Sequence, residues 1–196
     1  MNPQFWWYVT RASGIVAWLM LTASVIWGVI LSTKAFPEQR RPAWILDLHR
    51  WLGGLAVSFV AIHLIALIAD SYAHFTLTDV AVPFASDWKP GAVAFGVIAT
   101  WLLVAVELTS LAMRRLPRKV WRAIHTTSYV VFWLTSIHAA LAGTDRTQRL
   151  YQVTAAASIF AVAWALMYRL ANRRAAQPPI PPRDLERALN LPGDGW

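Results

Sequence analysis

The sequence predicts an all-α protein, an integral membrane bundle of five transmembrane helices. Hydrophobic residues make up 57% of its 196 residues and charged residues only 14%, whereas a soluble domain usually carries about 25% charge. Five apolar stretches approach the roughly 20 residues that a spanning helix needs. They cover approximately residues 13–32, 51–69, 91–113, 122–142 and 152–170.

These stretches divide the chain into three parts. Residues 1–12 form an outer N-terminal segment, whose aromatic residues we expect at the membrane interface. A secretory signal is the alternative for the first stretch, but this stretch is longer than a typical signal core and no clear Ala-x-Ala site follows. Residues 13–172 form the transmembrane domain, and residues 173–196 a Pro-rich tail that is too short to fold as a domain.

The basic residues are distributed unequally between the two sides that alternating spans define. One side holds 14 of the 18 Lys and Arg residues, namely Lys34, Arg40, Arg41, Arg50, Arg114, Arg115, Arg118, Lys119, Arg122, Arg169, Arg173, Arg174, Arg183 and Arg187. The positive-inside rule places this side in the cytoplasm. We therefore expect a multi-pass cell-membrane protein, in contact with lipid, with its N-terminus outside and its C-terminus in the cytoplasm.

The composition also excludes several kinds of function. The chain has no cysteine, which excludes disulfides, thiolate iron–sulfur clusters and cysteine nucleophiles. No nucleic-acid motif accompanies the basic residues, so their net charge of +8 indicates topology rather than a nucleic-acid partner. No Gly-rich phosphate loop or dinucleotide fingerprint occurs in the chain.

Four of the five histidines lie on two of the apolar stretches. His49 and His63 are 14 residues apart, and His125 and His138 are 13 residues apart. At 1.5 Å per residue, each separation is about 20 Å along a helix. A step of 14 residues keeps two side chains within about 40° on one helix face, whereas a step of 13 turns them about 140° apart. If His125 and His138 are both metal ligands, helix tilt, local unwinding or a π-bulge must compensate for this difference in side-chain direction.

The alternating topology matches these histidines in depth. Both stretches run from inside to outside, so His49 lies level with His125, and His63 with His138. Each level then offers two imidazoles, which are common metal ligands and the usual axial ligands of six-coordinate haem. We expect two haems stacked across the membrane as a path for electrons. Zinc is disfavoured because the two levels are too far apart to share one tetrahedral centre.

The residues around these histidines resemble the ferric reductase-like transmembrane domain family. The shared features are His49-Arg-Trp-Leu-Gly-Gly with His63, then Trp121-Arg-Ala-Ile-His125 with Tyr129 and His138. The family includes ferric reductases, the membrane part of NADPH oxidases and the haem partner of periplasmic methionine sulfoxide reductase. The resemblance implies that the four histidines ligate two b-type haems in the pairing above.

Large members of that family carry a flavin and nicotinamide domain that this sequence lacks. We therefore expect electrons from a separate flavoprotein reductase, from quinol, or from a flavin or quinone bound at the membrane face. We expect the electron acceptor on the outer side. The alternative function is a non-redox membrane transporter or assembly factor whose histidines bridge helices; the absence of proline within the spans disfavours a transporter.

Four other residues are considered for a functional role. Arg50 and Arg122 lie nearest the inner histidines in sequence, where they would neutralise haem propionates. Glu107 is the acidic residue well inside an apolar stretch, and either a proton-transfer or quinone-binding role or an interfacial position fits it. His74 lies in the outer loop with Asp70 and Asp79, where we expect it to be solvated; weak metal binding is the alternative.

Overall fold

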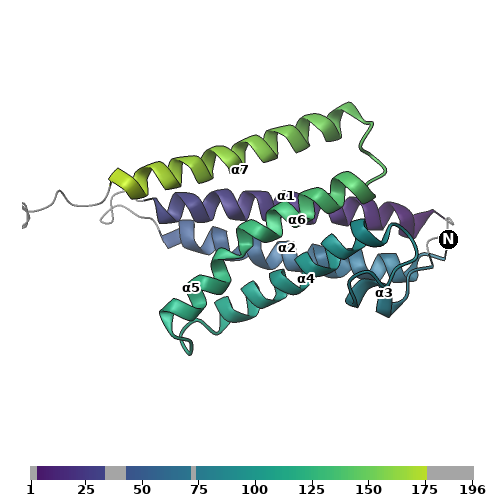
Figure 1. The fold of residues 1–196 in the computed structure, drawn as a ribbon, viewed down its shortest axis with the longest axis horizontal. Helices are drawn as coiled ribbons and strands as arrows, with labels where there is room; N and C mark the ends of the chain where they lie inside the picture. Colours follow the sequence, from purple (N-terminus) through teal and green to yellow (C-terminus); the bar gives the residue numbers. More distant parts are fainter. Residues whose placement is uncertain (1–3, 34–42, 72–73, 176–196) are drawn as a thin grey trace, which may run out of the picture.

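The computed structural model describes residues 4–33, 43–71 and 74–175. These residues form helices joined by short turns, without a strand (Figure 1). In chain order the helices are α1 (Phe5–Ser32), α2 (Ala43–Ala69), α3 (Leu77–Ala81), α4 (Pro90–Leu111), α5 (Arg118–Thr126), α6 (Ser128–Ala142) and α7 (Arg149–Ala175). Most of the Pro-rich tail and part of the segment between the first two apolar stretches lie outside the described residues.

Four of the described helices are long and apolar enough to cross a membrane. They contain the spans Phe5–Ser32, Trp44–Ala69, Pro90–Leu111 and Arg149–Asn172. Their lengths of 22 to 28 residues match or exceed the roughly 20 residues that a hydrocarbon core requires. The all-α membrane bundle predicted from the sequence is thereby confirmed.

The fourth predicted span, residues 122–142, is divided into two helices. The 9-residue α5 and the 15-residue α6 meet at Thr127. The Thr127 N–H donates to the Ile124 carbonyl at 2.9 Å, and the Thr127 hydroxyl donates to the same carbonyl at 2.7 Å. This tighter turn interrupts the α-helix without proline or glycine. The prediction of five spans therefore stays a prediction, since this segment is two shorter helices.

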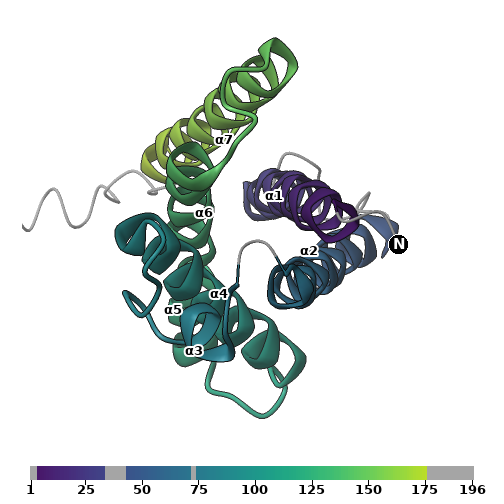
Figure 2. The ribbon, with the colours of Figure 1, turned by 90° about the vertical axis from the view of Figure 1, so that its right-hand side faces the viewer.

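The helices form two groups with a common core. Figure 2 shows α1 and α2 together on one side, and α4, α5, α6 and α7 on the other. The chain runs back and forth, so α1 and α2 are antiparallel, as are α4 and α6 (Figure 1). The buried core consists of Trp18, Leu21, Val25, Ala56, Ala99, Leu103, Val131, Phe132 and Val162.

This core lies midway along the bundle and separates its two ends. On α2 its member Ala56 lies between His49 and His63, and on α6 Val131 and Phe132 follow His125 and precede His138. One polar contact crosses the core, from the Trp18 indole N–H to the Ser136 hydroxyl at 3.0 Å. The two histidine levels are therefore separated by packed apolar side chains.

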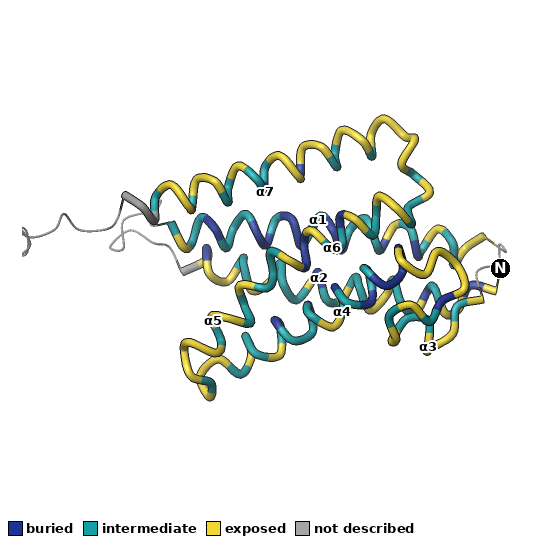
Figure 3. Tube along the Cα trace, viewed as in Figure 1, coloured by how far each residue is buried: buried dark blue, intermediate teal, exposed yellow. Residues whose placement is uncertain are grey.

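The outward faces of the bundle are apolar as well. Figure 3 shows long exposed segments on α7. Phe160 is 70% exposed and Trp164 63% exposed, although both lie in the middle of the helix. Large apolar side chains in such positions are typical of helices that contact lipid.

Candidate functional site: two histidine pairs

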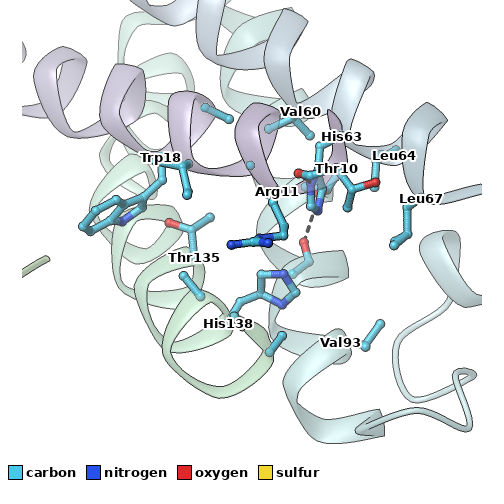
Figure 4. Close-up of a pocket in the computed structure, with 18 of the residues that line it drawn as sticks. Thr10, Arg11, Trp18, Val60, His63, Leu64, Leu67, Val93, Thr135 and His138 are labelled. Carbon is cyan, nitrogen blue, oxygen red and sulfur yellow. Dashed lines mark hydrogen bonds between the residues drawn. The ribbon is translucent and has the colours of Figure 1, made fainter. Parts of the chain in front are cut away.

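One end of the bundle contains a cavity that His63 and His138 both line. Its volume is about 520 Å³, within the range of about 300–1,000 Å³ typical of small-molecule and cofactor sites. His63 comes from α2 and His138 from α6, while α1 and α4 supply the walls between them. Figure 4 shows both rings at the cavity, with the Arg11 side chain extending into it from α1.

At the other end of the bundle, His49 and His125 face each other directly. Their ring centroids are 5.9 Å apart, and their planes are inclined by 76°. His49 comes from α2 and His125 from α5. The structure thus brings the four histidines together in the two pairs expected from the topology.

Hydrogen bonds fix the ring orientation of three of these histidines. Their Nδ1 atoms lie 2.8 Å, 3.1 Å and 2.8 Å from backbone carbonyl oxygens, in the pairs His63–Thr10, His49–Ser24 and His138–Ala92 respectively. A carbonyl oxygen only accepts, so each Nδ1 must carry the ring proton. The Nε2 atom of each neutral ring is then left with a lone pair, which is the form of imidazole that binds a metal.

Glycines on α1 and α4 make room for the same three rings. A Cβ atom at Gly96 would lie 2.8 Å from His138 Nδ1, and one at Gly14 would lie 3.0 Å from His63 Nδ1. At Gly28 it would lie 3.2 Å from His49 Cε1. Larger residues at these positions would push the rings away from the carbonyls to which they donate. Gly14 and Gly28 are 14 residues apart, as are His49 and His63 on the antiparallel partner helix.

The break at Thr127 resolves the mismatch of the 13-residue step. His125 lies on α5 before the break, and His138 on α6 after it. Both nevertheless contact α4, His138 through the Ala92 carbonyl and His125 through the Ser110 hydroxyl at 3.2 Å. Local unwinding is thus the feature that lets both histidines face the same neighbouring helix.

Comparison with known protein families identifies the family of this chain. A family model described as "Ferric reductase like transmembrane component" matches residues 13–136, more than half of the chain. The chain belongs to this family. The matched region contains His49, His63 and His125 and ends two residues before His138. No curated protein and no solved structure matches the chain.

Family membership confirms the resemblance seen in the sequence and supports a membrane electron-transfer component. Within the described residues, no group of three or more His, Asp or Glu side chains gathers in a way that could hold a metal ion. Each histidine pair of this ferric reductase-like chain thus brings two imidazoles together, without a third such side chain in the described part of the chain.

The two arginines predicted to accompany the His49–His125 pair are both exposed. The Arg50 guanidinium pairs with Asp47 at 3.3 Å, with both side chains more than half exposed. Arg122 is exposed on α5. Their role as propionate partners stays a prediction.

Two other arginines reach inward, and sequence reasoning did not single them out. Arg11 forms a two-pronged ion pair with Asp145, through Nε at 2.9 Å and through Nη2. Arg169 on α7 contacts the Tyr129 hydroxyl on α6 and lies 5.4 Å from the centre of that ring. Their partners are 134 and 40 residues away in sequence, which is why no local pattern indicated either contact.

Glu107 and His74 make no hydrogen bond to the paired rings within the described residues. Glu107 is half-buried between α4 and α2, where its Oε2 would be 3.3 Å from a Cβ atom at Gly53. Gly53 thus makes room for this carboxyl group, and a Cβ at Gly54 would meet open space. His74 is exposed, with a φ of 50°; Asp79 instead caps α3 together with Thr76.

Proposed function

We propose that this chain is a di-haem b-type membrane cytochrome that carries electrons across the bilayer as the membrane subunit of an oxidoreductase. One haem would be held by His49 and His125, and the other by His63 and His138. The observation that carries this proposal is the shared state of the rings: three have Nδ1 bound to a backbone carbonyl, and the fourth has Nδ1 bound to a hydroxyl. Within the described residues, Nε2 of each ring makes no hydrogen bond and is available to a metal.

The residues at both pairs fit such a cofactor. His49 and His125 come from different helices and their ring centroids lie 5.9 Å apart, so both imidazoles could be offered to one metal. The Trp121 ring stacks on His125 at 5.1 Å, and its buried Nε1–H has no hydrogen-bond partner in the described chain. That donor suits a polar group of a bound cofactor. The cavity at His63 and His138 is large and mostly apolar in its walls.

The protein's own part in electron transfer is positioning and insulation. A haem with two imidazole ligands cycles between ferric and ferrous iron without an open coordination site. His49 with His125 and His63 with His138 would hold two such groups at levels about 20 Å apart along the helices. Apolar core side chains such as Ala99, Val131 and Phe132 would lie between them, and the hydrogen-bonded rings would limit the movement that accompanies a change of charge.

We also propose the orientation and the partners. The excess of basic residues near α5 supports a cytoplasmic location for the His49–His125 end. We propose that a separate flavoprotein or quinol supplies electrons there. An acceptor on the opposite side would take them from the His63–His138 end.

The alternative function is a transporter, which the expectation of unbroken spans disfavoured. The break at Thr127 removes that argument, because it interrupts one predicted span without proline. Family membership and the paired rings favour the electron carrier instead. Reconstitution with haem during expression, followed by purification, tests the choice. We expect about two low-spin haems per chain, with visible bands that sharpen on reduction. A colourless, folded preparation would reject the proposal.

A further inference from the structure

Three of the four histidines are held by the same arrangement of one glycine and one backbone carbonyl. In each, the ring lies over a glycine and donates to the carbonyl of the residue four positions earlier on that helix. The glycine–carbonyl sets are Gly14 with Thr10, Gly28 with Ser24, and Gly96 with Ala92. One helical turn separates the glycine from the residue that supplies the carbonyl. Each set therefore offers a hydrogen-bond acceptor next to the space left by the missing side chain of the glycine.

The fourth histidine, His125, is held in a similar way, except that a serine takes the place of the glycine. Ser110 lies 14 residues after Gly96 on α4, the separation that also relates Gly14 to Gly28. The carbonyl four residues before Ser110 belongs to Val106. The Ser110 hydroxyl donates to that carbonyl at 2.7 Å, and its oxygen lies 3.2 Å from His125 Nδ1.

The direction of these bonds follows from the single hydroxyl proton. Because Ser110 uses that proton on the Val106 carbonyl, its oxygen must accept from His125 Nδ1–H. The ring is thus connected to the same kind of carbonyl as the other three rings, but through an inserted hydroxyl group.

We propose that Ser110 is the positioning residue of His125, and that its hydroxyl sets the reduction potential of the His49–His125 centre. This inference rests on the proposed function. An acceptor on Nδ1–H makes an imidazole a more electron-donating ligand and fixes its orientation. A more electron-donating ligand favours the oxidised metal. Ser110 therefore tunes one centre of the two, while backbone carbonyls, which substitution does not remove, serve the other.

The test uses three variants of the full chain with both haems bound. Ser110→Ala removes the acceptor, so we expect the potential of the His49–His125 centre to rise. The expected size is about tenfold in the ratio of reduced to oxidised centre, or about 59 mV for a one-electron couple. Ser110→Gly removes the hydroxyl but opens the gap found at the other positions. His125 can then donate directly to Val106, and we expect the potential to return towards that of the natural chain.

Thr109→Val is the matched control. Its hydroxyl lies in the same turn and donates to the Ala105 carbonyl at 2.7 Å, with a longer contact of 3.2 Å to the Val106 carbonyl. Unlike Ser110, it makes no hydrogen bond to a histidine of the described chain. We expect no shift in either centre. The measurement is a redox titration followed by absorbance, with haem content determined in parallel.

The outcomes separate this inference from the proposed function. A natural chain without haem would reject the proposed function itself. A natural chain with two haems, and an unchanged potential in Ser110→Ala, would overturn the role of Ser110 alone. An equal shift in Ser110→Gly and Ser110→Ala would also overturn it. If Ser110→Ala loses one haem outright, retention of both haems in Ser110→Gly supports the inference and their loss contradicts it.

Discussion

The two histidine pairs lie at opposite ends of the bundle, yet they are held in different ways. At the His63–His138 end, both rings donate to backbone carbonyls and lie over glycines of α1 and α4. At the other end, His49 is seated in that manner, whereas His125 depends on a serine hydroxyl and stacks on Trp121.

This difference indicates which parts of the molecule define each site. The His63–His138 site depends on the backbones of α1 and α4, two helices that run without interruption past both rings. At the His49–His125 site the α1 backbone holds His49, whereas His125 depends on side chains and on α5, a short helix that follows a turn and precedes the break at Thr127. We expect the first site to respond most to added bulk, and the second to lost hydrogen-bonding groups.

The largest expected effect is the loss of one centre at a time. His138→Ala or His63→Ala should remove the haem at that end and leave the other haem in place, because the core separates the two sites. His125→Ala should do the reverse. Haem content and low-spin resonances measured on the purified variants check this. Loss of both haems from a folded variant, or of neither, would contradict the pairing.

The next effect concerns the space beside the rings. Gly96→Ala places a Cβ atom 2.8 Å from His138 Nδ1, so the ring must leave the Ala92 carbonyl. Loss of such a partner typically weakens metal binding about 10- to 100-fold. We expect weaker haem retention at that end, and a milder effect from Gly28→Ala, where the distance is 3.2 Å.

Gly54→Ala is the control for the glycine variants. It lies within α2, and its added Cβ would meet open space. Replacing a mid-helix glycine by alanine commonly stabilises a helix by about 0.5–1 kcal/mol. Haem retention and thermal stability should therefore be unchanged or slightly higher. Equal haem loss in Gly54→Ala and Gly96→Ala would show that seating of the ring is not the cause.

A smaller effect is expected from the ion pair at the cavity. Arg11→Gln removes a positive charge near the His63–His138 centre, which favours its oxidised form and lowers its reduction potential. Asp145→Asn leaves the Arg11 charge uncompensated and should raise that potential. Redox titration of both variants checks the opposite signs, with the His49–His125 centre as an internal control. Shifts of the same sign would contradict this account.

The smallest effect lies outside the membrane spans, at α3. Hydrogen bonds from the Thr76 hydroxyl and N–H hold the pKa of Asp79 below its ordinary value. The cap is thus fully present above about pH 3.9, and it is lost as pH falls through the lowered pKa. Carboxyl titration by NMR should give a midpoint below the ordinary value, and Thr76→Ala should raise it. A normal midpoint in the natural chain would contradict the capping contact.

The sequence predicted the pairing of the histidines because helical rise and alternating topology together determine depth. It did not predict which residues hold the rings in place. Gly14 and Gly28 lie beside His63 and His49 because α1 packs antiparallel to α2, and this packing is a tertiary feature. Nor did the sequence locate the break at Thr127, because neither proline nor glycine marks that turn. The contact of Arg11 with Asp145 depends on tertiary packing, for which the sequence offers no local signal.

The central claim is that two stacked centres carry electrons from one end of the bundle to the other. The most direct measurement uses vesicles that contain the purified chain and trapped ferricyanide, with a membrane-impermeant reductant outside. We expect ferricyanide reduction through the natural chain, and loss of that flux in His138→Ala and His125→Ala alike. Flux that persists without either histidine, or that is absent from a chain with both haems bound, would contradict the account.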